Sequence, residues 1–214
     1  MKKTIHFIRH GQTRYNLEKK IQGSVDIPLS DIGIKQAEDF DIKTCLPKYD
    51  IAYHSSLCRS KKTLEIILGK LENPPNKIII SDLIKERSYG IFEGLHETEI
   101  ESKYPETFYK WKLDENTTIL DAETIEVVIY RVLDFVDMIV QSDDTNIIAV
   151  THSGVLYSLY KYISDIDLGV RPKELYFHNC CSVYLNVYVN ENKKIDKYEF
   201  MFGDKINLEL KICN

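Results

Sequence analysis

Two short, mostly apolar segments of this chain each run directly into a histidine-containing turn. Ile5–Ile8 is followed by Arg9-His10-Gly11, and Asn146–Val150 is followed by Thr151-His152-Ser153-Gly154. Short apolar runs bounded by such turns are typical of strands buried in a sheet. Ligands of open α/β sheets bind at the carboxyl ends of the strands. The two turns therefore predict one site, assembled from both halves of the chain around His10 and His152.

The rest of the sequence alternates between strand and helix patterns. Strands are expected at 4–9, 50–53, 77–81 and 146–151, with a final hairpin at 182–189 and 195–202. Helices are expected at 31–43, 57–70, 96–103, 105–112, 122–141 and 154–163. This alternation, followed by an antiparallel tail, predicts a three-layer α/β/α sandwich. No linker divides residues 1–214, so we expect a single domain, in which the irregular segment 86–121 is a small cap inserted over the sheet edge.

The composition fits a protein with a substantial core and argues against several classes of function. The chain has 214 residues, of which 43% are hydrophobic and 29% charged, and its net charge is −5. Nucleic-acid binding requires a basic face, which an acidic chain does not favour. The apolar runs are too short to cross a bilayer, and the run after Met1-Lys2-Lys3 is too short for a signal peptide. We therefore expect a cytoplasmic protein that binds neither nucleic acid nor a membrane.

The cysteines show no metal-binding or disulfide pattern. They are five in number and scattered, at Cys45, Cys58, Cys180, Cys181 and Cys213. An odd count without metal-ligand spacing predicts reduced thiols, as in a cytosolic protein. The adjacent pair most simply contributes to a strand, and no metal or other cofactor is expected.

Arginine is rare in this chain, so its positions are informative. There are six arginines beside 22 lysines, which indicates that lysine serves wherever a plain surface cation is enough. Arg9 lies in the first histidine turn, and Arg59 lies just past the strand expected at 50–53. Guanidinium groups bind phosphate or carboxylate through two parallel hydrogen bonds. A lone arginine at such a place is often a solvated cation, but its recurrence at the same sheet edge predicts an anion site.

The long polar loop after His10 offers further groups to a bound anion. Asn16 lies six residues past His10, where its side-chain amide could reach back to the ligand. For Gln22 and Gly23, ligand contact and turn geometry are equally good interpretations.

Five segments follow one another in an order that matches a known family. They are Arg9-His10-Gly11-Gln12-Thr13, Gln22-Gly23-x-x-Asp26-x-Pro28-Leu29-Ser30, Ser55-Ser56-Leu57-x-Arg59, Glu86-Arg87-x-x-Gly90-x-Phe92-Glu93-Gly94 and His152-x-Gly154. In this order they resemble the histidine phosphatase superfamily, most closely its phosphoglycerate mutase-like branch, over about residues 3–190. The resemblance implies a mostly parallel six-stranded sheet with an antiparallel edge, and a phosphohistidine mechanism that needs no metal.

The chemistry of phosphate esters explains why the resemblance places these residue types together. Phosphate monoesters hydrolyse so slowly in water that catalysis can require accelerations of up to about 10²¹-fold. A neutral imidazole is a competent nucleophile near pH 7, and the resemblance implies that His10 is this nucleophile. Arg9, Arg59 and His152 would hold the charged phosphoryl oxygens. Glu86 would protonate the leaving group and later accept a proton from the attacking water.

Several further residues are assigned with alternatives left open. The resemblance implies that Asn16 and backbone N–H groups near Gly11 and Ser153 help to hold the phosphoryl group, together with the N-terminus of the following helix. Ser153 stands where many relatives carry glycine, so its side chain either contacts the ligand or points away. Tyr89 is as good a candidate for substrate contact as for packing. The remaining histidines are interpreted as packing or surface residues: His6, His54, His96 and His178.

The expected cap is short, and its residues 95–121 contain no arginine. Between residues 95 and 121 its cations are Lys103, Lys110 and Lys112, and the loop that follows carries Glu123 as an uncertain site member. A mutase has to hold its intermediate while that intermediate reorients, and this cap is weakly equipped to do so. We therefore expect a phosphomonoesterase acting on a small acidic phosphometabolite, such as phosphoserine, a phosphoglycerate or a sugar phosphate. A cofactor-dependent phosphoglycerate mutase and a catalytically silent phosphate-binding protein are the alternatives, and a homodimer formed through an edge strand stays open.

Overall fold

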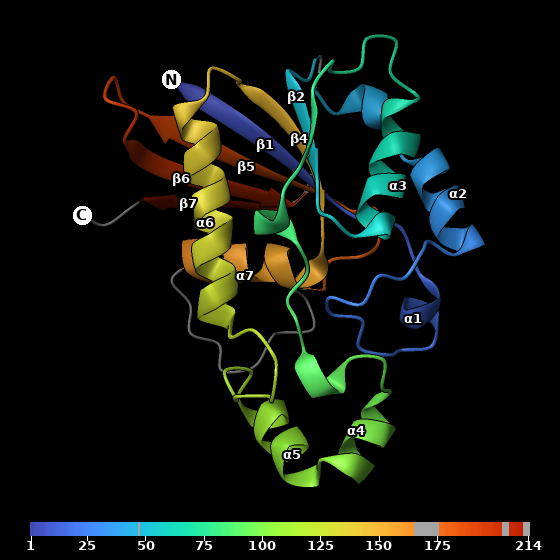
Figure 1. The fold of residues 1–214 in the computed structure, drawn as a ribbon. Coiled ribbons are helices and arrows are strands. Elements are labelled where there is room, and N and C mark those ends of the chain that lie inside the picture. The colour runs from blue at the N-terminus through green and yellow to red at the C-terminus, as the bar shows by residue number, and fades with distance from the viewer. Residues whose placement is uncertain (47, 165–175, 203–205, 212–214) are drawn as a thin grey trace.

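A mixed β-sheet forms the middle layer of the molecule (Figure 1). The structure is a computed structural model, and it describes residues 1–46, 48–164, 176–202 and 206–211. The strands are β1 (Lys2–Arg9), β2 (Ile51–His54), β3 (Ile78–Ile80), β4 (Asn146–Thr151), β5 (Ser182–Val189), β6 (Ile195–Phe202) and β7 (Ile206–Lys211). They lie side by side in the order β3-β2-β4-β1-β5-β6-β7.

The strand directions divide the sheet into two parts. The neighbours among β3, β2, β4 and β1 pair in parallel, whereas β5, β6 and β7 add on in antiparallel pairs. The expected α/β sandwich with an antiparallel edge is confirmed. Within the described residues the sheet has seven strands rather than six, because residues 206–211 continue past the expected hairpin and pair with β6.

Helices cover both faces of the sheet. They are α1 (Arg14–Leu17), α2 (Asp31–Asp39), α3 (Cys58–Leu68), α4 (Glu97–Lys103), α5 (Pro105–Leu113), α6 (Ile125–Gln141) and α7 (Ser153–Ser164), with short 3-10 turns at η1 (Ile42–Thr44), η2 (Asp82–Ile84) and η3 (Gly90–Phe92). On one face, α6 and α7 share a core with the sheet in which Phe135 packs against Phe7. On the other face, α2 and α3 share a second core, in which Leu64 and Ile8 are buried.

The alternation of side chains along β1 decides which face each residue serves. Successive side chains of a strand point to opposite faces. Ile5 and Phe7 belong to the core under α6 and α7, whereas Ile8 belongs to the core under α2 and α3. By the same alternation, the side chain of Arg9 belongs to the face covered by α6 and α7, and that of His10 belongs to the face covered by α2 and α3.

The register of the parallel strands brings the ends of three of them together. β4 lies between β2 and β1, and Arg9 in β1 pairs opposite Thr151 in β4. His10 and His152 each come directly after these partners, and Ser55 comes directly after β2. The three residues therefore leave the same edge of the sheet as neighbours.

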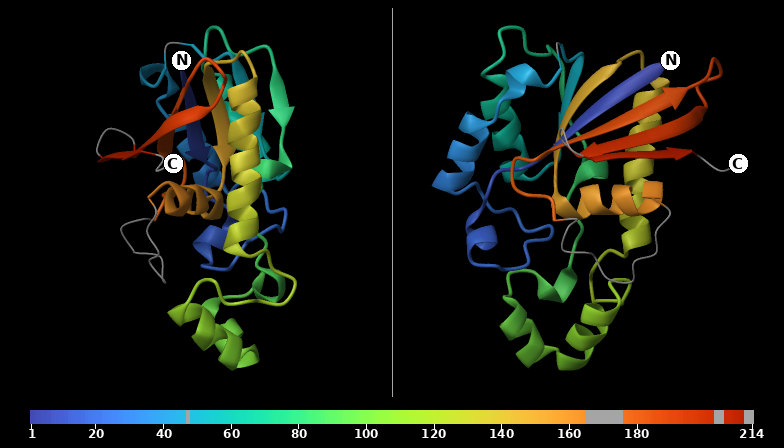
Figure 2. Two further views of the ribbon diagram at one scale, coloured as in Figure 1. Left: turned by 90° about the vertical axis from the view of Figure 1, so that its left-hand side faces the viewer. Right: turned by 180° about the vertical axis from the view of Figure 1, so that it is seen from behind.

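The helices α4 and α5 stand apart from the sheet, beyond the carboxyl ends of its parallel strands (Figures 1 and 2). They lie within the segment that the sequence assigns to a cap and enclose a small core of their own, formed by Phe92, Ile100, Phe108 and Ile119. Local signals start both helices: Pro105 is the first residue of α5, and the ring of His96 accepts a hydrogen bond from Thr98 N at the start of α4.

At one edge of the sheet, β3 leaves two large apolar side chains, Ile78 and Ile80, exposed. Edge strands are templates for pairing with another chain, and a homodimer through this edge stays a prediction. Across the described ranges, no helix combines the length and the apolar character that crossing a membrane requires.

Candidate active site

The rings of His10 and His152 lie next to each other at the carboxyl edge of the sheet. Their centroids are 5.0 Å apart and their planes are tilted by 55°. The N–H of His10 donates to Thr151 O over 3.0 Å, so the backbone continues the β1–β4 pairing up to the first ring. Both rings are buried. The convergence of the two histidines expected from the sequence is confirmed.

One ring nitrogen of His10 is fixed by the turn that follows it. Nδ1 lies 2.7 Å from the carbonyl oxygen of Gly11, and because a carbonyl oxygen only accepts, Nδ1 carries the proton. Burial, and after it the charges of Arg59 and Arg9, holds the pKa of His10 well below its usual value. The imidazole is therefore neutral, and Nε2 keeps the lone pair that a nucleophile needs.

The second ring, that of His152, is held from the neighbouring strand. Its Nε2 lies 2.7 Å from Ser55 Oγ. Burial, and then the positive charge of Arg59, lowers the pKa of His152 well below its usual value. Its Nδ1 is buried and has no hydrogen-bond partner among the residues that the structure describes. With the Ser55 hydroxyl donating to Nε2, Nδ1 carries the proton and offers an unused donor.

Arg59, the second residue of α3, is fully buried. Its terminal nitrogens donate to Val25 O over 2.7 Å and to Gly23 O over 2.8 Å, which fixes the plane of the guanidinium. In the described part of the chain no carboxylate forms an ion pair with this group. A buried charge without a counter-ion is costly, so the position is suited to a bound anion.

The backbone at Gly23 makes this anchoring of Arg59 possible. Gly23 has a φ of +51°, in the left-handed region, and a Cβ there would lie 2.0 Å from Glu93 Oε1. The same Glu93 oxygen accepts hydrogen bonds from Ser24 N over 2.8 Å and from Tyr89 N over 2.9 Å, and thus ties the loop to the cap. The structure therefore shows a turn role for Gly23, and its contact with a ligand stays a prediction.

Arg9 reaches the site from the opposite face of the sheet. Its guanidinium donates to Phe177 O and lies 5.5 Å from the ring centre of Tyr176, and its side chain is buried. Its Nε has no partner among the described residues. The strand alternation that separates Arg9 from His10 thus places cations on both sides of the paired rings.

Unused hydrogen-bonding capacity is concentrated at this site. Buried polar atoms in folded proteins are almost always hydrogen-bonded, so each exception requires an explanation. Over the described residues, four buried side-chain nitrogens or oxygens lack a partner, and three of them are Arg9 Nε, Arg59 Nε and His152 Nδ1. All three are donors, or become donors when protonated, which is the chemistry that phosphoryl oxygens require.

Glu86 lies at the N-terminus of α7. Its carboxylate accepts a hydrogen bond from Gly154 N over 3.0 Å and another from Arg87 N over 3.0 Å. A Cβ at position 154 would lie 2.4 Å from Glu86 Oε1, so only glycine allows this approach. The helix N-terminus stabilises the negative charge of Glu86 and of any phosphate nearby.

The other predicted binding residues differ in how directly they face the histidines. Asn16 Oδ1 accepts from Thr13 N over 3.1 Å, which turns its amide NH₂ away from that donor. Gln22 is buried and accepts from the Thr13 hydroxyl over 2.7 Å, so its side chain shapes the loop. Ser153 is the half-buried first residue of α7. Tyr89 lies further out, in the cap, under the guanidinium of Arg87 at 5.1 Å.

Two positioning residues were missed by the sequence reasoning. Ser55, which orients His152, was noted only as part of a motif, although its place directly after β2 was a usable signal. Asn179 donates through Nδ2 to His10 O over 2.9 Å and to Asn16 Oδ1 over 3.3 Å. No feature of the sequence pointed to Asn179, because it follows a segment without a clear pattern.

Glu123 takes a structural place. Its carboxylate binds Arg131 through Nε and Nη2, each over 3.0 Å, and accepts from Ser88 N over 2.9 Å. These bonds join the start of the cap to α6. Glu123 also lines a pocket together with Glu86, so its membership of the site stays a prediction.

The cysteines in the described residues are free thiols, and Cys213 lies outside those residues. Burial raises the pKa of Cys180 to about 12 and that of Cys58 to about 11, so both stay protonated and unreactive at neutral pH. Cys180 and Cys181 lie in the turn just before β5 rather than in a strand, and Cys180 N donates to Arg9 O over 3.0 Å. No group of three or more metal-binding side chains occurs among the described residues.

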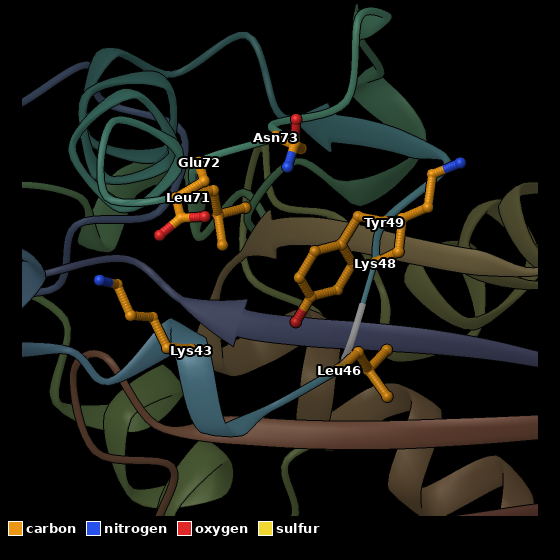
Figure 3. A pocket seen from close by; sticks show the side chains of 7 residues that line it. All are labelled: Lys43, Leu46, Lys48, Tyr49, Leu71, Glu72 and Asn73. Carbon is orange, nitrogen blue, oxygen red and sulfur yellow. The ribbon is translucent and has the colours of Figure 1, made fainter.

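Two pockets lie at opposite ends of the sheet. One, of about 550 Å³, is near the amino end of β2 and is lined by Lys43, Leu46, Lys48, Tyr49, Leu71, Glu72 and Asn73 (Figure 3). It contains none of the residues assigned to the phosphoryl group. The other, of about 390 Å³, is lined by residues of the cap and α7, including Tyr89 and Gly154.

Comparison with known proteins agrees with this geometry. The sequence model of the histidine phosphatase superfamily (branch 1) matches residues 5–199. The chain is 32% identical over 169 residues to an uncharacterized phosphatase, PhoE, of Bacillus subtilis, covering 78% of this chain and 81% of that protein. It is 29% identical over 181 residues to a 2,3-bisphosphoglycerate-dependent phosphoglycerate mutase of Cytophaga hutchinsonii, covering 79% and 84%. A mycobacterial glucosyl-3-phosphoglycerate phosphatase shares the fold, with a TM-score of 0.76 at 19% identity over 94% of this chain and 98% of the other. The chain belongs to the histidine phosphatase superfamily.

Proposed function

We propose that this chain is a metal-independent phosphomonoesterase that hydrolyses a small phosphorylated metabolite through a phosphohistidine intermediate. The observation that carries the proposal is the set of unpartnered buried nitrogens in Arg9, Arg59 and His152, beside the neutral ring of His10. A phosphoryl group placed there would meet donors that have no other use. Phosphoserine, phosphoglycerates and sugar phosphates are the candidate esters.

In the first step, Nε2 of His10 attacks phosphorus, and the bond between phosphorus and the ester oxygen breaks. The leaving alkoxide takes a proton from Glu86, which lies at the N-terminus of α7 and has to enter this step in its protonated form. The two guanidinium groups and the Nδ1–H of His152 hold the peripheral oxygens, on which the negative charge stays throughout the transfer. In this proposal Arg9 and Arg59 act mainly through fixed charge and position.

In the second step, water attacks the phosphohistidine and gives a proton to Glu86. The nitrogen–phosphorus bond breaks, inorganic phosphate forms, and His10 returns to its neutral state. Atoms and charges balance without a metal or an external cofactor. Asn179 holds the backbone carbonyl of His10, and the Gly11 carbonyl holds its ring, through both steps.

A phosphoglycerate mutase is the alternative that the relatives also support. Such an enzyme returns the phosphoryl group to a second hydroxyl and must hold the intermediate while it turns. Cations in the cap would serve this purpose, but Lys103 and Lys110 are exposed and Lys112 is ion-paired with Glu97 over 3.0 Å. We therefore favour transfer to water.

The proposal is tested with the purified chain, p-nitrophenyl phosphate and a panel of phosphorylated metabolites, in the presence of a chelator. We expect release of inorganic phosphate that the chelator does not reduce, and an acid-labile ³²P adduct on His10 in rapidly quenched wild-type reactions. His10→Ala should abolish both. A chain that binds phosphate without turnover, an adduct at another residue, or isomerisation of 3-phosphoglycerate that requires a bisphosphate primer and yields no free phosphate would overturn the proposal.

A further inference from the structure

The pocket between the cap and α7 continues directly from the phosphoryl site. Gly154 belongs to both places, since its N–H donates to Glu86 and its surface lines the pocket. Tyr176 also lines the pocket, and its ring contacts the guanidinium of Arg9. An ester whose phosphoryl group lies between the two histidines would therefore direct its alcohol part into this space. Its volume of about 390 Å³ is within the range of small-molecule sites.

Aromatic rings line this pocket from both sides. Tyr89 and Trp111 come from the cap and meet edge to face, with centroids 6.4 Å apart. Tyr157 of α7 and Tyr176 line it as well. Aromatic side chains offer large apolar surfaces that stack on planar groups and pack against sugar rings. The shape and the surface chemistry therefore fit a ring better than a short open chain.

Both carboxylates that line the pocket are paired with lysines. Lys112 pairs with Glu97 over 3.0 Å, and both line the pocket. Glu115, a third lining residue, accepts from the Tyr157 hydroxyl over 2.7 Å and pairs with Lys161 over 3.2 Å.

Arg87 is held on the pocket wall by backbone and ring contacts. Its Nε donates to Glu123 O over 2.9 Å, and its guanidinium lies over the ring of Tyr89. Among the described residues, the lining has two cations, Arg87 and Lys112, and two carboxylates, Glu97 and Glu115. Both carboxylates already pair with lysines, so it is the aromatic surfaces that indicate a substrate class.

From this lining we infer that the preferred substrate is the phosphate monoester of a ring-bearing alcohol, and that its ring lies between Trp111 and Tyr157. This inference rests on the proposed function and names the substrate class of the same site. Hydroxyl or amine groups on the ring would find acceptors in Glu115 and Ser158 at the pocket wall. Phosphoserine and 3-phosphoglycerate then become poor substrates, because they leave the aromatic surfaces uncovered.

The chain offers a direct reporter of ring binding. Trp111 is its only tryptophan, so tryptophan fluorescence reports on this one wall of the pocket. Phenylphosphonate carries a ring and cannot be hydrolysed, whereas inorganic phosphate carries no ring. We expect phenylphosphonate to change the emission of Trp111 at saturation and phosphate alone to leave it unchanged. This measurement does not depend on turnover.

The kinetic test compares 2-naphthyl phosphate with phosphoserine in the wild type, Trp111→Ala and Tyr109→Ala. Tyr109 is a matched control, because it lies on the same helix but is exposed and does not line the pocket. We expect Trp111→Ala to raise KM for 2-naphthyl phosphate about tenfold, as loss of an aromatic contact does, and to change KM for phosphoserine less than twofold. Tyr109→Ala should change neither.

The outcomes separate this inference from the proposed function. Equal kcat/KM for both esters, or equal losses for both in Trp111→Ala, would overturn the ring preference while leaving the phosphatase intact. If no ester is hydrolysed, the proposed function fails, and the fluorescence titration still decides whether the pocket takes a ring. An emission of Trp111 that phenylphosphonate and phosphate change equally contradicts the inference.

Discussion

One histidine is buried in the middle of β1 and another directly after its end, yet the two positions have opposite character. His6 bonds at both ring nitrogens, to the Tyr49 hydroxyl over 2.6 Å and to Ser182 Oγ over 2.8 Å, and it stacks on Tyr184 with centroids 4.4 Å apart. His10 bonds through Nδ1 to its own turn and points Nε2 toward a site lined with unused donors.

Burial and a shifted pKa therefore do not identify a catalytic histidine in this fold. Burial lowers the pKa of His6 to about 3, and it is also the main cause of the lowered pKa of His10. The two residues differ in the hydrogen bonding around them. Both ring nitrogens of His6 have partners, whereas buried donors near His10 have none. A functional imidazole is recognised here by unsatisfied neighbours, a criterion that the sequence does not contain.

The largest effect is expected for His10, directly after β1. His10→Ala should lower kcat by a factor on the order of 10³ or more, because removing the nucleophile leaves only binding and electrostatic assistance. Phosphate release measured at saturating ester, together with circular dichroism to verify folding, checks this. Residual activity within tenfold of the wild type would contradict the assignment of the nucleophile.

The opposite result, a loss of stability without a loss of activity, is expected for His6 in the middle of β1. His6→Leu should lower the free energy of unfolding by about 1–3 kcal/mol, since it leaves the buried hydroxyl of Tyr49 without a partner. The kcat of the folded fraction should stay within twofold of the wild type. Urea denaturation and steady-state kinetics on one preparation measure both quantities, and a large loss of kcat without loss of stability would erase the contrast between the two histidines.

A smaller effect is expected for Ser55, which directly follows β2 and orients the ring of His152. Ser55→Ala should lower kcat about tenfold, the value of one lost hydrogen bond of about 1.4 kcal/mol, by freeing the ring of His152. Ser55→Thr, which keeps the hydroxyl, should recover most of that loss. A higher KM with an unchanged kcat, or no recovery of kcat in Ser55→Thr, would show that Ser55 does not act through His152.

The smallest effect concerns pH. A histidine with a lowered pKa in the folded state is neutral in both states above its unfolded pKa, and below that value only the unfolded chain takes up the proton. Stability should therefore fall as pH drops from about 6.5 to about 5.5, by about 1 kcal/mol for each of the three histidines whose pKa is lowered, namely His6, His10 and His152. In His6→Leu this loss should be smaller by about 1 kcal/mol, which denaturation at the two pH values measures. An unchanged pH dependence in the variant would show that His6 does not titrate as proposed.

Much of the fold could be predicted because its signals are local. The hairpin at 182–189 and 195–202 and the strand at 146–151 follow from periodicity and turn residues, and the structure has them at the same bounds. β7 was missed although residues 206–211 alternate apolar and polar side chains, which is itself a local strand pattern.

The site residues also divide into those that local sequence patterns predict and those that depend on distant packing. His10 and His152 were found because each directly follows an apolar strand, where sequence alone locates the sheet edge. Asn179 was missed because its contact with His10 O depends on how a distant turn packs against β1. The ion pairs at the outer pocket were missed as well, since pairs such as Glu115 with Lys161 join separate elements of the fold.

The pairing of Arg9 with Thr151 has a consequence for how this protein becomes active during folding. These residues come from opposite halves of the polypeptide, and parallel partners so far apart close late because of the entropy lost in forming the loop. No early, locally ordered intermediate can contain the two-ring centre. The recovery of phosphate release in a refolding experiment would thus report on the long-range pairing of β1 with β4, and not on the appearance of the helices.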